Sequence, residues 1–233
     1  IAEDYSFPYD NAGGFFSEFC DAGGQITGAS WVPVGTTDYA TIISTIPDET
    51  DAVYVGLGGA DAASFLSQAV TAGVAKPLVG GTIAVDTTAL SGDTNLASAA
   101  EGMISGGPVP GQDYDNPNWI EFSDAYTALP DAFPSPSIFA ILPYNSIMPL
   151  LMGIETTGGD LGADQENLHE ALSATDWNSP TGNITVDENN QGIVDNFIVE
   201  VQSDGGELVL NTISEAAGVT QDTVTYDRFD SCP

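Results

Sequence analysis

Few side chains in this sequence have the chemistry needed for catalysis. His169 is the single histidine, and its surroundings, Asn-Leu-His-Glu, are typical of a solvent-exposed helix. Nucleophilic catalysis by serine or cysteine requires a base beside the nucleophile, and one exposed histidine is a poor source of it. Neither a Gly-x-Ser-x-Gly turn nor a phosphate-binding Gly-x-x-x-x-Gly-Lys-Ser/Thr loop is present. We therefore predict no catalytic residues, and an enzyme is the least favoured interpretation.

Two clusters of oxygen-bearing side chains, Asp113–Asn116 and Asp187–Gly192, are candidates for Ca²⁺ binding. The second lacks the longer loop with a terminal glutamate that Ca²⁺-binding loops use, so we interpret both clusters as solvated turns. A zinc site needs grouped cysteine and histidine ligands, whereas Cys20 and Cys232 lie near opposite ends of the chain. We predict no metal and no cofactor. Asn183-Ile-Thr185 matches the glycosylation pattern, which is short enough to arise by chance.

Three polar or glycine-rich segments follow short apolar runs, as binding loops do. They are Asp4–Tyr9, Gly56–Asp61 and Gly80–Thr82. The spacing in Gly56–Asp61 differs from that of dinucleotide-binding turns, so no dinucleotide site is predicted. In a parallel sheet, ligands bind beyond the carboxyl ends of the strands, and glycine lets a ligand approach the backbone closely. These segments are therefore expected to meet at one edge of a sheet and to form a binding cleft.

Strand-like and helix-like patterns alternate along the first half of the chain. Strands are expected at Ile1–Tyr5, Gln25–Val34, Asp51–Leu57, Pro77–Gly80 and Gly102–Val109. Helices with one apolar face are expected at Asn11–Ala22, Thr37–Ile46 and Ala60–Ala72. This order is typical of a parallel sheet with helices on both faces, so the sequence predicts an α/β fold with a doubly wound, parallel sheet.

The composition changes at Gly106–Pro117, a segment rich in glycine, proline and aspartate that is typical of a crossover. Helices are expected after it at Asn118–Ala128, Ser137–Thr157 and Asp164–Ser173, and strands at Gly182–Val186, Ile193–Gln202 and Glu207–Leu210. The polar tail from Thr212 to Pro233 is expected to wrap the surface. The predicted division is an α/β lobe at 1–108, a hinge at 109–117, a helical part at 118–192, and return strands with a tail at 193–233.

The charge balance excludes whole classes of partner. Thirty-four Asp and Glu residues accompany two cations, Lys76 and Arg228, and the net charge is −32. Affinity for nucleic acids and for anionic membrane surfaces comes mainly from Lys and Arg, so neither is an expected partner. The longest apolar segment, Ile138–Ile154, is interrupted by Pro143, Asn145 and Pro149, and we expect no bilayer span. With 42% hydrophobic residues the chain can still bury a core.

Several segments, in their order along the chain, resemble the type I periplasmic solute-binding proteins of ABC importers. The similar segments are Asp4–Tyr9, Pro33–Tyr39, Asp51–Asp61, Ala100–Met103, Tyr144–Gly158 and Ser179–Glu188. The likeness is to the group that binds branched-chain amino acids, amides or urea, and it covers all but about the last twenty residues. The resemblance implies a two-lobed α/β fold that clamps a small ligand between its lobes and performs no chemistry.

The resemblance also implies a set of ligand-binding positions. They are Phe7, Tyr9, Gly58, Gly59, Ala60, Asp61 and Thr82. Amino-acid binders of this group place an acid near the position of Thr82 to meet the ligand ammonium, and threonine cannot supply that charge. Asp61 or Asp86 could supply it instead. The Phe7-Pro8 pair is more similar to the amide and urea branch, and packing of Phe7 and Tyr9 at a lobe surface is the alternative to ligand contact.

The expected function is that of an extracytoplasmic solute-binding protein. It would deliver a small polar or amino-acid-like nutrient to the membrane subunits of an ABC importer, from the periplasm or the cell exterior, with a lipid anchor as one option. The ligand-sensing domain of a receptor is the alternative from another class.

Two further expectations depend on the resemblance. The N-terminal part of the first lobe precedes the position of Ile1 in the family, so the chain is expected to be a fragment with an incomplete first lobe. The family's last strands return to the second lobe, which would place the tail near Cys20 and favour a Cys20–Cys232 disulfide. Two separate thiols remain the alternative.

The charge of −32 leads to a prediction about salt. Like charges destabilise the folded state, and the Debye length falls from ~10 Å at 0.1 M salt to ~3 Å at 1 M. We interpret the charge as an adaptation to saline or acidic surroundings, with an ordinary acidic secreted protein as the alternative. The melting temperature is expected to rise between low and molar sodium chloride, and a flat profile in thermal unfolding would show that the acids are too dispersed to matter.

Overall fold

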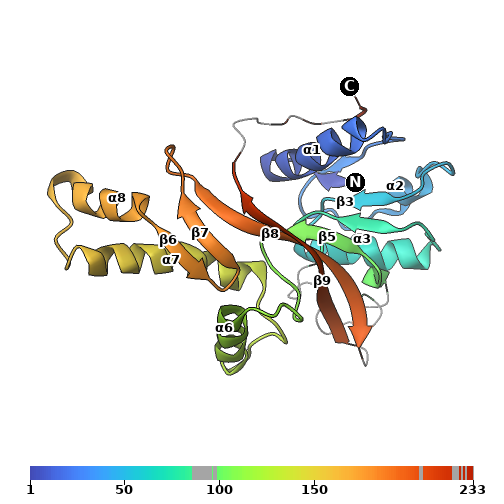
Figure 1. The fold of residues 1–233 in the computed structure, drawn as a ribbon. Helices are drawn as coiled ribbons and strands as arrows, with labels where there is room; N and C mark the ends of the chain where they lie inside the picture. The colour runs from blue at the N-terminus through green and yellow to red at the C-terminus, as the bar shows by residue number, and fades with distance from the viewer. Residues whose placement is uncertain are drawn as a thin grey trace.

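The computed structural model describes residues 1–85, 96, 99–204, 207–221, 226, 228 and 230–232, and it shows two bodies joined by a long β-ribbon (Figure 1). The first body contains β1 (Ala2–Glu3), α1 (Ser6–Asp21), β2 (Trp31–Val32), α2 (Ala40–Ser44), β3 (Val53–Val55), α3 (Gly59–Thr71), β4 (Leu78–Gly80) and β5 (Ile104–Gly107). The second contains α6 (Pro117–Thr127), α7 (Ile138–Thr156), the 3₁₀ turn η1 (Ala163–Gln165), α8 (Glu166–Ser173), β6 (Asp176–Ser179) and β7 (Gly182–Val186). The ribbon is formed by β8 (Gly192–Asp204) and β9 (Glu207–Val219).

The sheet of the first body is parallel, as predicted, but only as far as β5. Strands β1 and β2 pair in parallel, as do β3, β4 and β5, and an isolated bridge between Ala2 and Gly56 links the two sets. Strand β8 then pairs with β5 in the antiparallel sense. The prediction of purely parallel sheets is therefore wrong. Strands β6, β7, β8 and β9 also pair in the antiparallel sense, because strands joined by short connections cannot pair in parallel.

The β8–β9 ribbon connects the two bodies. The start of β8 pairs with β7 at Gly192 and Ile193, and its later residues Phe197–Glu200 pair with β5. Strand β9 accompanies β8 along its length, from Glu207 opposite Asp204 to Val219 opposite Val194. The sequence prediction that the polar tail starts at Thr212 is wrong, because the strand continues to Val219 and belongs to this ribbon.

The first body has a well-developed apolar core and the second has little. Val55, Leu57, Phe65, Leu66 and Val201 are among the fully buried side chains that pack between the sheet and its helices. In the second body the described buried apolar side chains are fewer, and α7 exposes a series of large ones. These are Phe139, Leu142, Tyr144, Ile147, Leu151 and Met152, of which Phe139 is 69% exposed.

Helix α7 is, among the described residues, the one helix long and apolar enough to cross a membrane. It has 19 residues and a mean hydropathy of 1.4. Length and composition alone are weak evidence, because the core helix of a folded domain has the same properties. The helix contains Pro143 and Pro149, and its Asn145 Nδ2 donates a hydrogen bond to Thr181 Oγ1 at 2.8 Å. The prediction that the chain has no bilayer span therefore stays a prediction.

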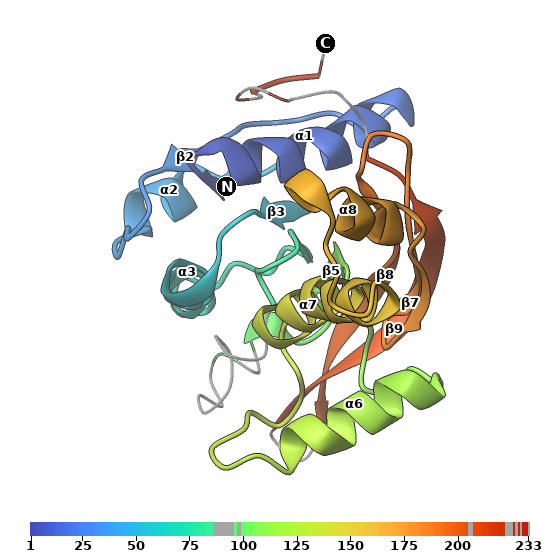
Figure 2. The ribbon, with the colours of Figure 1, turned by 90° about the vertical axis from the view of Figure 1, so that its left-hand side faces the viewer.

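The end of the chain returns to the first body and lies over α1 (Figure 2). Cys20 and Cys232 form a disulfide, with an S–S distance of 2.06 Å, as predicted. The Tyr226 backbone N–H donates to Asp10, and the Arg228 guanidinium lies 3.6 Å from the Asp4 carboxylate. The predicted path of the tail beside α1 is thus correct for the described residues 226, 228 and 230–232.

Candidate functional site

The first helix begins earlier than predicted, and this separates two of the predicted site residues. Helix α1 starts at Ser6, not at Asn11, so Phe7 and Tyr9 are helical. Residues two positions apart on a helix, such as these, are turned by roughly 200° relative to each other. Phe7 is 43% exposed and lies near Tyr5, whereas Tyr9 packs edge-on against Trp31 and its hydroxyl donates to Asp4. Of this predicted pair, Phe7 is the one whose ring is offered to solvent.

The glycine-rich turn forms the N-terminus of α3, with Gly58 in the capping position. No side chain caps the helix, and Gly59 and Ala60 are exposed in its first turn. The first N–H groups of a helix have no intrahelical partner, and the helix dipole makes this end positive. A Cβ at Gly58 would lie 2.3 Å from Ile83 Cδ1, so the turn packs directly against the residue after Thr82. The predicted loops at β3 and β4 therefore lie side by side.

Asp61 does not face the site. Its side chain is 7% exposed, and its Oδ2 accepts a hydrogen bond from the Gly35 N–H at 2.7 Å. The carboxylate thus stabilises a loop within the first body rather than presenting a charge to a ligand. Asp86, the other acid considered for that role, lies outside the described residues.

Glu3 is a second buried acid close to Asp61. It is 4% exposed and accepts a hydrogen bond from the Gly58 N–H at 3.3 Å. Burial raises the pKa of the Glu3 carboxyl, and the negative charge of Asp61 raises it further, while the bond from Gly58 acts in the opposite direction. The buried Tyr39 hydroxyl has no hydrogen-bond partner among the described residues, and burial and these two acids raise its pKa. Carboxylates are thus buried behind the α3 N-terminus.

Thr82 is held by a residue that the sequence analysis did not select. Asn11 Nδ2 donates to Thr82 Oγ1 at 2.8 Å, and Asn11 Oδ1 accepts from the Tyr54 hydroxyl at 2.6 Å. Asn11 follows Phe7 by four residues, so the two share one side of α1. A correct helix start at Ser6 would have revealed this spacing, and Asn11 would then have been a candidate.

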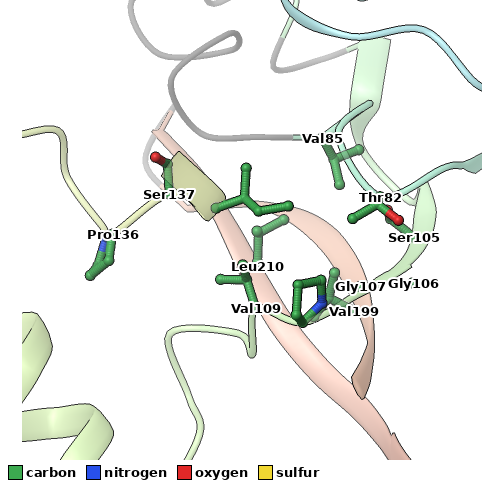
Figure 3. A pocket seen from close by; sticks show the side chains of 12 residues that line it. Thr82, Val85, Ser105, Gly106, Gly107, Val109, Pro136, Ser137, Val199 and Leu210 are labelled. Atoms are coloured by element: carbon green, nitrogen blue, oxygen red, sulfur yellow. The ribbon is translucent and has the colours of Figure 1, made fainter. Parts of the chain in front are cut away.

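A small cavity lies where the two bodies meet (Figure 3). Thr82 and Val85 line it from the first body, Gly107 from the end of β5, Ser137 from the start of α7, and Val199 from β8. Its volume is ≈ 30 Å³. A water needs roughly 10–15 Å³ by this measure, so the cavity has room for about two waters. It marks the junction of the bodies and is not by itself a ligand pocket.

A larger groove lies elsewhere in the first body, and the sequence analysis did not predict it. Phe15, Phe16, Phe19 and Tyr54 line it, and its volume is ≈ 720 Å³. Its remaining lining residues include Ile1 and Val53, at the starts of strands. The groove is thus distinct from the strand ends at which the sequence predicts the ligand.

The environment of Glu3 leads to a prediction for Glu3→Gln. An acid with a raised pKa holds its proton more tightly in the folded state than in the unfolded state. Its favourable contribution to the free energy of unfolding is therefore complete below the ordinary pKa of 4.5. That contribution is lost as the pH rises through the raised pKa. Glu3→Gln is therefore expected to be more stable than the wild type at pH 7, with the difference vanishing in acid. Urea unfolding across pH, with the exposed Glu18→Gln as control, measures this. Loss of stability at pH 7 would show that the hydrogen bonds to the ionised carboxylate, from Gly58 and Tyr5, outweigh the cost of burying its charge.

Comparison with known proteins gives a consistent picture. A family model described as periplasmic binding protein matches residues 1–206. The leucine-, isoleucine-, valine-, threonine- and alanine-binding protein of Pseudomonas aeruginosa is 31% identical over 180 residues, which are 76% of this chain and 44% of that protein.

Solved structures agree with this match. An ABC transporter substrate-binding protein from Sphaerobacter thermophilus superposes with a TM-score of 0.82 at 25% identity, over 93% of this chain and 59% of that one. A solute-binding protein from Rhodopseudomonas palustris BisB5, in complex with 3,4-dihydroxybenzoic acid, gives 0.81 at 24% identity, over 94% and 60%. The chain thus spans about half the length of its curated relative. These matches confirm the predicted resemblance, and the family is one of binding proteins rather than enzymes. The chain belongs to the periplasmic binding protein family.

Proposed function

We propose that this chain is part of an extracytoplasmic solute-binding protein that delivers a small nutrient to the membrane subunits of an ABC importer. The observation that carries the proposal is the convergence of three strand ends at the junction of two bodies. Thr82 lines the cavity between the bodies, the α3 N-terminus packs against Ile83 beside it, and Asn11 of α1 donates a hydrogen bond to Thr82. Ligands of open α/β folds bind at such strand ends, and closure of two bodies around a ligand is a hinge motion.

The ligand we propose carries an apolar body and a carboxylate. The relatives named above bind aliphatic amino acids and a dihydroxybenzoic acid, and both classes of ligand have these two parts. The exposed Phe7 ring offers apolar contact area. The uncapped N–H groups at the start of α3 offer donors for the carboxylate, since helix N-termini bind anions. Both described cations have partners in this chain, Lys76 the Asp48 carbonyl and Arg228 the Asp4 carboxylate.

We also propose that the two bodies are the two lobes of the family fold, with the first lobe only partly present in this chain. The supporting observation is the exposed apolar face of α7, because exposed apolar patches this continuous are rare on monomers. Further residues of the same protein would cover this face, which agrees with the partial coverage of the relatives. The natural protein is then expected to be heavier than 24.1 kDa. An intact mass equal to that value would contradict the proposal.

Substitution of Gly59 tests the proposed site. Gly59 has φ +51° in the first turn of α3, and a Cβ there would meet no atom within 4 Å, so a large side chain would project into the proposed cleft. Gly59→Trp is expected to weaken binding of leucine or 3,4-dihydroxybenzoate at least ~10-fold, a loss of about 1.4 kcal/mol in calorimetry.

Gly59→Asn is the matched control, because asparagine tolerates left-handed backbone better than other residues. It should bind nearly as the wild type does. Equal affinities of the tryptophan and asparagine variants would exclude this turn from the site, and failure of the wild type to bind any amino acid or aromatic acid would refute the proposed function.

A further inference from the structure

The orientation of the Asn11 side-chain amide is fixed by its neighbours. The Thr82 backbone N–H approaches Asn11 Oδ1 at 3.4 Å, and a backbone N–H can only donate. The Tyr54 hydroxyl reaches the same oxygen at 2.6 Å. The carbonyl oxygen of the amide must therefore face these two groups. Its NH₂ group must then face Thr82 Oγ1, 2.8 Å away.

This orientation determines the role of the Thr82 hydroxyl. A hydroxyl group has one hydrogen to donate and two lone pairs to accept with. Asn11 donates to it, so one lone pair is used. Among the described residues no acceptor lies within hydrogen-bond distance of the Thr82 hydroxyl hydrogen, and Thr82 is only half-buried. Within the described part of the chain the hydroxyl hydrogen is thus left available for a ligand.

Close packing holds this arrangement in place. A Cβ at Gly81 would lie 2.4 Å from Asn11 Oδ1 and 2.9 Å from the Tyr54 hydroxyl, so the amide occupies the space that a larger residue would need. The Ser105 hydroxyl donates to the Gly81 carbonyl at 2.9 Å. The Thr82 methyl group packs toward Gly107, where a Cβ would lie 2.9 Å from Thr82 Cγ2. Methyl and hydroxyl therefore have different surroundings, which favours one rotamer.

We propose that Asn11 is a positioning residue that keeps the Thr82 hydroxyl as a hydrogen-bond donor, so that the site selects ligands with an acceptor oxygen at this point. The inference rests on the proposed function. It adds to that function that one position in the site donates, rather than accepts, a hydrogen bond. A carboxylate or carbonyl oxygen fits this subsite, and an ammonium group does not. Phe7 lies one turn earlier on the same side of α1, and its apolar ring is exposed to solvent.

Benzoate and benzylammonium are suitable probes, because they pair the same ring with an acceptor or a donor. In the full-length protein, calorimetry is expected to show benzoate binding at least ~10-fold more tightly than benzylammonium. Thr82→Val should remove most of this preference, and Thr82→Ser, which keeps the hydroxyl, should retain it. Asn11→Ala should also reduce the preference, and Thr82→Val should add little to that variant.

Asn11→Asp gives the sharpest comparison. An aspartate at position 11 still accepts hydrogen bonds from the Tyr54 hydroxyl and from the Thr82 N–H, so the variant keeps two of the three bonds of Asn11. It therefore remains a usable test if Asn11→Ala does not fold. It cannot donate to Thr82, whose hydroxyl would turn toward the carboxylate and offer lone pairs to the ligand. The preference should then move to benzylammonium. Asn189→Asp, which adds the same charge in an exposed turn, is the control and should behave as the wild type.

Three results would overturn the inference. They are a wild-type preference for benzylammonium, an unchanged preference in Asn11→Asp, and absence of benzoate binding to the wild type. A measurement of leucine binding distinguishes failure of this inference from failure of the proposed function. If leucine binds and benzoate does not, the solute-binding role stands and the donor assignment fails, and if no probe binds, both fail.

Discussion

The pairing of β8 with both β5 and β7 is the interaction on which the rest of this structure depends. Backbone groups in a buried sheet must be hydrogen-bonded, so a strand that pairs with both bodies fixes their connection. The ladder between β8 and β9 has irregularities at Val194/Asn196 and at Ile198/Val199. The first lies between the residues that pair with β7 and those that pair with β5. Because bulges bend and twist a ribbon locally, a local bend of the ribbon is expected at the boundary between the bodies.

The position of the candidate site follows from that pairing. Strand β5 lies between β8 and β4, so the ribbon brings the start of α7 beside the end of β4, where Thr82 lies. Helix α1 then supplies Asn11 from the opposite side and fixes the hydroxyl of Thr82. The subsite is thus assembled from elements that are distant in sequence, and each is held by packing or hydrogen bonds that do not involve a ligand. Such preorganisation reduces the ordering cost of binding.

The sequence indicated the order of elements well, because apolar periodicity and glycine punctuation are local signals. The glycine turn before α3 and the helices at α6 and α7 were predicted within a few residues. The sheet direction after β5 was not predictable in this way, since strand pairing is a long-range property. The predicted helix began at Asn11 instead of Ser6, which left Pro8 outside it, although proline is well tolerated in the first turn of a helix. That error put Phe7 and Tyr9 on one surface and concealed Asn11.

The electrostatics of the chain bear on how the proposed site would bind an anionic ligand. With 34 acidic residues and two cations, the long-range field repels an anionic ligand and cannot steer it into the cleft. In the proposed site, attraction would have to come from the N–H groups of α3 and the Thr82 hydroxyl, whose dipoles act only over short distances. Asp61 and Glu3 point into the body behind α3, where Gly35 and Gly58 donate to them. A ligand at the helix N-terminus would thus contact the donors directly, and these donors would lie between it and the buried acids. The positions of the donors, rather than the net charge of the chain, would then govern selectivity.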